Sequence, residues 1–152
     1  MSLIGRLGEN YKNLPDILAE YELILADAEG HILTKGKTLG NANAEHASWQ
    51  YYYDSRMADL SMLVKYFQGQ VDATRGRLFK KMTSATSLEL SDRQREKFID
   101  NDEQYLEKYE VYLEVLGLYE KYKAASEAFK SRGYALMNIT KARVADVEHG
   151  EI

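Results

Sequence analysis

Two clusters of Lys and Arg are the stretches of this sequence best suited to a chemical task. The first spans residues 73–82, ATRGRLFKKM, and places four cations around Phe79. These cations are Arg75, Arg77, Lys80 and Lys81. Cations of this kind can follow the phosphates of a single strand while an aromatic ring stacks on a base. They also suit an ordinary helix C-terminus, where the helix dipole favours positive charge.

The second cluster spans residues 130–143, KSRGYALMNITKAR, and holds a glycine inside a predicted helix. Glycine destabilises a helix interior by about 1 kcal/mol relative to alanine, so Gly133 needs a compensating role. It can permit a close helix approach, a bend or a backbone contact to a ligand. Lys130 and Arg132 beside it would suit a phosphate. The alternative is a glycine C-cap, after which the chain turns.

Catalytic and metal-binding patterns are not found in the sequence. The three histidines are His31, His46 and His149, and none belongs to a metal pattern such as H-E-x-x-H. A row of glutamates, Glu103, Glu107, Glu110 and Glu114, lacks the Glu-x-x-His pairs of di-metal bundles. Glycine-rich nucleotide-binding loops and nucleophile motifs are also missing. We therefore expect a protein that is not an enzyme and that needs no cofactor.

Composition and charge narrow the class of protein further. The chain has 152 residues, one proline and no cysteine, which favours a single helical domain without disulfides. No segment predicts a signal peptide or a membrane span. The net charge of −4 is distributed in blocks. Residues 56–81 hold six basic and two acidic residues, whereas residues 89–120 hold four basic and ten acidic ones.

Hydrophobic spacing predicts the elements that must position these clusters. We expect an N-terminal helix and loop over 1–41, a basic helix over 42–82, a linker over 83–90, a long helix over 91–145 and a flexible tail over 146–152. Within the first segment, Asn13-Leu-Pro15 predicts the start of a helix over 14–28. Ser91 and Gln94 form a capping-box pattern at the start of the second long helix.

Both long helices carry apolar seams with spacings of three and four. The first seam runs through Trp49, Tyr53, Arg56, Leu60, Leu63, Phe67, Val71, Thr74 and Leu78, and the second through Tyr105, Tyr109, Tyr112, Leu116 and Tyr119. A chain of this size cannot cover two such seams alone. We predict an all-α fold in which the two long helices form an antiparallel hairpin that assembles into a homo-oligomer.

Three stretches of the chain resemble the UvsY family, the recombination mediators of T-even-type bacteriophages. AFKSRGYAL (128–136) looks like the C-terminal signature of that family, and TRGRLFKKM (74–82) is similar to its central basic segment. LPDILAEYE (14–22) is similar to its opening helix. The order and spacing of the three stretches agree over most of residues 14–146. The chain departs from the family at Lys80-Lys81, where a Tyr pair is usual.

The resemblance implies a function in binding rather than in catalysis. UvsY-like proteins bind single-stranded DNA coated by the phage single-strand-binding protein and help to load the UvsX recombinase, in the cytoplasm of the infected bacterium. They act as rings of six or seven subunits assembled through the C-terminal region. The resemblance puts Arg75 and Arg77 on the basic positions of the family, where they would bind phosphates. The departure at Lys80-Lys81 removes a pair of rings that could stack on bases but keeps positive charge, so we expect these lysines to support DNA binding, with Lys65 and Arg56 as further candidates. Assembly or DNA contacts are expected from Lys130, Arg132, Gly133, Tyr134, Leu116 and Tyr119.

The residue patterns are also compatible with two other functions. In a structural scaffold, the basic blocks would pair with the acidic blocks of neighbouring copies and would have no affinity for DNA. In an adaptor, the Tyr-rich stripe at 105–122 would bind a protein partner, since tyrosine is favoured at interfaces.

Overall fold

The protein is all-helical, as predicted. The computed structural model describes residues 1–85 and 89–149, and no strand occurs in that part of the chain. The helices are α1 (Leu3–Arg6), the 3-10 helix η1 (Glu9–Tyr11), α2 (Leu14–Ala26), α3 (Ala28–Ile32), α4 (Leu39–Ala85), α5 (Asp92–Asp100) and α6 (Glu103–His149).

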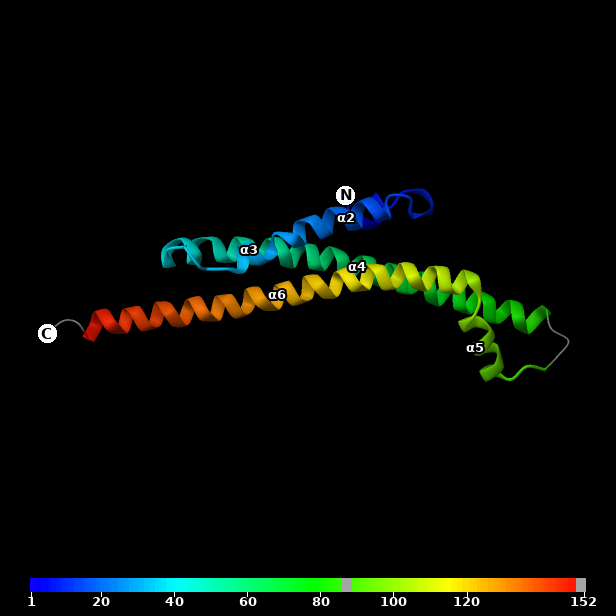
Figure 1. Ribbon diagram of the computed structural model, residues 1–152. Helices are drawn as coiled ribbons and strands as arrows, with labels where there is room; N and C mark the ends of the chain where they lie inside the picture. The colour runs from blue at the N-terminus through cyan, green and yellow to red at the C-terminus, as the bar shows by residue number, and fades with distance from the viewer. Residues whose placement is uncertain (86–88, 150–152) are drawn as a thin grey trace.

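Two helices of 47 residues each, α4 and α6, dominate the molecule. They run side by side in opposite directions, and they share the most extensive contact in the chain (Figure 1). Each is about 70 Å long at ~1.5 Å per residue. The short helices α2 and α3 lie along the same side of this pair, and α5 packs near the end of α4 (Figure 1).

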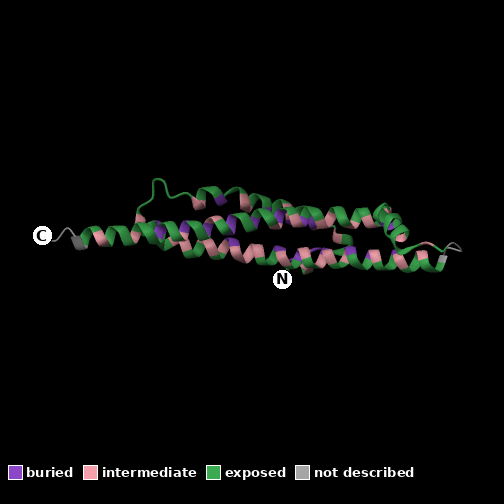
Figure 2. Ribbon diagram, turned by 90° about the horizontal axis from the view of Figure 1, so that it is seen from below, coloured by how far each residue is buried: buried purple, intermediate pink, exposed green. Residues whose placement is uncertain are grey.

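The buried residues recur along the two long helices (Figure 2). From α4 the core takes Tyr53, Leu60, Leu63, Phe67, Val71 and Leu78, and from α6 it takes Val115, Leu118, Tyr122, Ala125, Phe129 and Leu136. The spacing of three and four puts each set on one helix face. Burying each large apolar side chain stabilises the fold by about 1.5–3 kcal/mol. Tyr122 also donates a hydrogen bond of 2.7 Å from its hydroxyl to the Tyr21 carbonyl, which ties α2 to the pair.

The long helix predicted over 91–145 is in fact two helices. The predicted capping box is present, since the Ser91 side chain accepts from the Gln94 amide and the Gln94 side chain accepts from the Ser91 amide. The helix that it starts, α5, ends at Asp100. The Asp102 carboxylate then accepts hydrogen bonds from the amides of Gln104 and Tyr105, at 2.9 and 3.3 Å. This local cap starts α6 because it satisfies amides that have no partner within the helix.

Several predicted boundaries also differ from the observed ones. The first long helix begins at Leu39 rather than at 42, since Thr38 accepts from the Asn41 amide at 3.2 Å, and it continues to Ala85. The helix predicted over 14–28 ends at Ala26 and is followed by α3. Residues 146–149 of the predicted tail are helical. Residues 86–88 of the predicted linker and residues 150–152 of the tail lie outside the described residues.

Candidate nucleic-acid interface

The first basic cluster lies on the last quarter of α4. Val71, Thr74 and Leu78 turn one face of the helix into the core. The remaining positions point away from the core, and Arg77, Lys80 and Lys81 are exposed. Because they are three and four residues apart, Arg77, Lys80 and Lys81 share one face of the helix.

Arg75 and Arg77 both reach the junction between α5 and α6. The Arg75 guanidinium forms an ion pair with Asp100 at 3.1 Å and lies 5.4 Å from the centre of the Tyr105 ring. Arg77 donates to the side-chain oxygen of Gln104 at 3.0 Å. Asp100 and Gln104 are themselves exposed. A phosphate can therefore compete with them, since exposed ion pairs contribute only about 0–1 kcal/mol.

The two lysines of the cluster have no such partner. In the described part of the chain, neither Lys80 nor Lys81 forms an ion pair or a side-chain hydrogen bond. Lys80 borders a hollow of about 470 Å³ that is also lined by Arg75, Gly76 and Phe79. Asp72 and Glu96 line the same hollow, so its charge is mixed. The continuous positive surface is the face shared by Arg77, Lys80 and Lys81.

The aromatic ring of this cluster is not free to stack on a base from every side. Phe79 is half-buried, and the guanidinium of Arg95 from α5 lies 5.4 Å from its centre. The buried Arg95 Nε has no hydrogen-bond partner among the described residues. The arrangement thus favours charge over stacking at this end of α4.

The two further candidates on α4 do not join the cluster. Arg56 lies about 28 Å from Arg75 along the helix axis, and Lys65 lies about 15 Å from it. Arg56 is stacked 3.5 Å from the centre of the Tyr52 ring and donates to the Tyr52 carbonyl at 3.0 Å. Lys65 is exposed. The structure therefore assembles four of the six predicted DNA-binding cations at one place.

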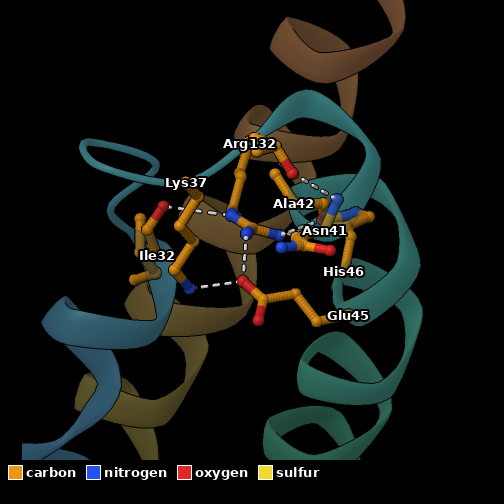
Figure 3. A network of polar contacts seen from close by, with 8 residues as sticks. Ile32, Lys37, Asn41, Ala42, Glu45, His46 and Arg132 are labelled. Atoms are coloured by element: carbon orange, nitrogen blue, oxygen red, sulfur yellow. Dashed lines mark hydrogen bonds and ion pairs between the residues drawn. The ribbon is translucent and has the colours of Figure 1, made fainter.

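Arg132, expected to contact DNA or another subunit, is instead a core residue. Its side chain is only 2% exposed and sits in a network between α3, α4 and α6 (Figure 3). It donates to the carbonyls of Ile32 (3.1 Å) and Ala42 (3.4 Å), to His46 Nδ1 (3.0 Å) and to the Glu45 carboxylate (3.1 Å). These bonds use its guanidinium within the chain, so Arg132 cannot present it to a phosphate in this conformation.

Gly133 permits a close approach between two helices of the chain. A Cβ atom at this position would lie 2.5 Å from Nε2 of His46 on α4. Such a distance is far below van der Waals contact, so any larger residue would force the histidine ring or the helix to shift. Lys130 and Tyr134 are exposed and line a hollow of about 330 Å³ next to it. Leu116 and Tyr119 are half-buried, and Tyr119 packs against the core.

The partners of the basic residues were missed by sequence reasoning. Asp100 and Gln104 follow Arg75 and Arg77 by 25 and 27 residues, so no local spacing relates them. Glu45 and His46 precede Arg132 by 87 and 86 residues. The cap at Asp102 is different, since an Asp two and three residues before the bonded amides is a local signal that was available.

The C-terminal end of α6 carries apolar side chains with little cover. It extends past the start of α4 (Figure 1). Ile139, Val144 and Val147 are 44%, 53% and 70% exposed. Val144 and Val147 line a hollow of about 510 Å³ with Leu39. Exposed apolar surface of this kind is typical of an interaction site.

Residues 1–85 and 89–149 hold neither a metal site nor a membrane span. No group of three or more acidic, His or Cys side chains in that range is placed to hold a metal ion. None of the helices described there has the length and apolarity that crossing a membrane requires. Comparisons with protein families, with curated proteins and with solved structures found no match for this chain.

Proposed function

We propose that this protein is a single-stranded-DNA-binding recombination mediator of the UvsY type. The observation that carries the proposal is the exposed face of Arg77, Lys80 and Lys81 at the end of α4, with Arg75 beside it. Among the described residues, the two lysines form no ion pair, and Arg75 has a partner that water already reaches. The phosphates of single-stranded DNA can pair with the lysines and can displace Asp100 from Arg75 at little cost in free energy.

A single copy of this face would bind DNA weakly, because the whole chain is acidic. In a ring of six or seven copies the face is repeated, and the sites act together through a high effective concentration. We propose that the exposed apolar end of α6 joins the subunits. Bound to a strand coated by the phage single-strand-binding protein, the ring would weaken that coat and help to load a UvsX-like recombinase in the host cytoplasm.

The first test is fluorescence anisotropy of a labelled ~40-mer single strand, with wild type and an Arg77→Ala/Lys81→Ala variant. We expect the variant to bind more weakly. The log–log slope of its affinity against salt should also be shallower by about 0.7 for each phosphate that the variant no longer neutralises. The matched control is Lys12→Ala/Lys35→Ala, which removes two exposed lysines elsewhere on the molecule. Sedimentation velocity should show the same assembly for all three proteins.

Absence of binding at low salt would contradict the proposal. Equal weakening by the control variant would show that the DNA does not bind at the end of α4. The second candidate, a protein adaptor or scaffold, would then be favoured. It is supported by the outer face of α6, where Leu106, Tyr109 and Leu113 are 42%, 37% and 44% exposed. The rings of Tyr105 and Tyr109 stack there at 5.8 Å.

A further inference from the structure

The contact between Arg132 and His46 constrains the protonation state of the histidine. Arginine has donors and no acceptor, and it stays charged at any ordinary pH. The 3.0 Å contact from Arg132 Nη1 therefore requires a lone pair on His46 Nδ1. His46 must then be neutral, with its proton on Nε2. A second proton on the ring would turn Nδ1 into a donor that faces another donor.

The groups around His46 offer almost no compensation for a new positive charge. From α6, Arg132, Lys130 and Tyr134 face it, and two of these are cations. From its own helix, Gln50 borders the same hollow, and its side-chain hydrogen bond to the ring raises the pKa of His46, by less than burial and Arg132 lower it. Glu45, the residue before His46, carries a carboxylate, but a single oxygen of it already bonds both Arg132 and Lys37.

Burial is the main cause that lowers the pKa of His46, and the charge of Arg132 lowers that pKa further. The Glu45 carboxylate has its own pKa lowered, first by the hydrogen bond from Lys37. Glu45 therefore stays charged and remains engaged with its two cations over the range in which a histidine titrates. From α3, His31 lies nearby but stacks on Trp49 at 3.5 Å.

The same network holds three segments together. Arg132 on α6 bonds the last residue of α3 through the Ile32 carbonyl and the first turn of α4 through the Ala42 carbonyl. Gly133 lets α6 approach the His46 ring closely (Figure 3 shows His46 beside Arg132). Loss of the bond to His46 would therefore weaken the attachment of α3 and of the start of α4 to α6 at one time.

We propose that the Arg132–His46 contact is a pH-sensitive latch, closed at neutral pH and opened when His46 takes up a proton. Opening separates the start of α4 from α6 and exposes the surface around Ala42 and Leu136, which are 2% and 3% exposed when it is closed. The device goes beyond DNA binding, since none of its residues belongs to the basic face at the end of α4.

The direction of the pH effect follows from linkage. The pKa of His46 is lower in the closed form than in the open or unfolded chain, so the open chain binds more protons. The stability from the latch is complete above the ordinary histidine pKa of about 6.5. It is lost as pH falls from that value through the lowered pKa of the closed form.

The test is hydrogen exchange of the wild type at pH 7.5 and 5.5, corrected for intrinsic exchange rates. We expect amide protection in residues 42–46 and 132–136 to fall as the pH is lowered. Between the pKa of His46 in the open form and its pKa in the closed form, protection should fall by about tenfold for each pH unit. The comparison variant is His46→Asn, whose side-chain oxygen can accept from Arg132 and does not titrate. Its protection in these segments should be nearly independent of pH. His31→Gln is the control for the neighbouring histidine: it removes the stack on Trp49 and the 2.9 Å hydrogen bond with Tyr53, but protection should keep the pH dependence of the wild type.

The proposal would be overturned if wild type and His46→Asn lost the same amount of amide protection between pH 7.5 and 5.5. It would also be overturned if protection in the wild type did not change between these pH values. A second measurement does not depend on any variant. The NMR titration of the His46 ring in the wild-type protein should have its midpoint below about 6.5. A midpoint at or above that value would also overturn the latch.

Discussion

At the scale of the residue, the most constrained part of the protein is the pair Arg132 and Gly133. One is a buried cation with four partners, and the other is a position where a Cβ atom has no room. Buried charge is tolerated only where hydrogen bonds and a counter-charge replace water. Here two carbonyls, an imidazole and a carboxylate do so. The glycine is needed because one of these partners, the imidazole, lies against the helix backbone.

Gly133→Ala is expected to destabilise the protein although alanine is the better helix former. The new Cβ would lie 2.5 Å from His46 Nε2, so the ring or the helix must shift, at about 1–3 kcal/mol for overpacking. The measurement is urea unfolding followed by circular dichroism.

The matched control for this change is Gly117→Ala on the same helix. No neighbouring atom of the described residues lies within 4 Å of a Cβ there, so this variant should gain about 0.5–1 kcal/mol in stability. Equal effects at the two glycines would contradict the close approach at Gly133.

At the scale of the element, the break between α5 and α6 sets the position of the basic cluster. Asp100 ends α5, and Gln104 and Tyr105 lie in the first turn of α6. These three residues contact Arg75 and Arg77. An uninterrupted helix would carry Asp100 further along the axis, away from the side of α4. The cap at Asp102 therefore supports both the start of α6 and the positions of the two arginines.

Asp102→Ala is expected to lower stability by about 0.5–2 kcal/mol, the usual effect of losing an N-cap. The reason is that the amides of Gln104 and Tyr105 would lose their acceptor. Asp102→Asn should retain most of the stability, because an amide oxygen also caps a helix. The measurement is the midpoint of thermal unfolding, and equal losses in both variants would argue against a capping role.

At the scale of the whole molecule, the two sides of the α4–α6 pair are covered unequally by other helices. The helices α2 and α3 cover one side of the α4–α6 pair, and α2 adds Leu14, Ile17 and Tyr21 to the core. The outer side of α6 and its C-terminal end keep apolar side chains exposed. A long, thin pair of helices leaves much of its surface apolar unless another chain covers it. We therefore propose that assembly takes place at the end of α6.

A Val144→Asp/Val147→Asp variant is expected to shift the protein from the assembled form toward the monomer. Two carboxylates would have to be buried in an apolar contact, at a high desolvation cost. The control is Asn138→Asp, which adds charge at an exposed polar position of the same helix. Sedimentation velocity at equal protein concentration measures the result. Unchanged assembly of the double variant would place the contact elsewhere.

The second predicted seam was wrong: none of its five residues is buried, and α6 instead buries Val115, Leu118, Tyr122, Ala125, Phe129 and Leu136. Local patterns in the sequence determined the helical class, most of the first seam, the capping box at Ser91 and the existence of the basic cluster. They suffice because helix periodicity, caps and dipole preferences act over a few residues. Element ends were less accurate, since the helix predicted over 91–145 is divided by the cap at Asp102.

Only the tertiary structure decided which charged residues are available to a ligand. Arg132 and Arg77 have the same chemistry, yet one is buried by partners 86 to 100 residues away and the other is exposed. The role of Gly133 likewise depends on a histidine from another helix. Contacts at such separations are set by how whole helices pack, and no local spacing encodes them. The sequence therefore determined where positive charge is concentrated, and the packing of α3, α4 and α6 decided which of it reaches the surface.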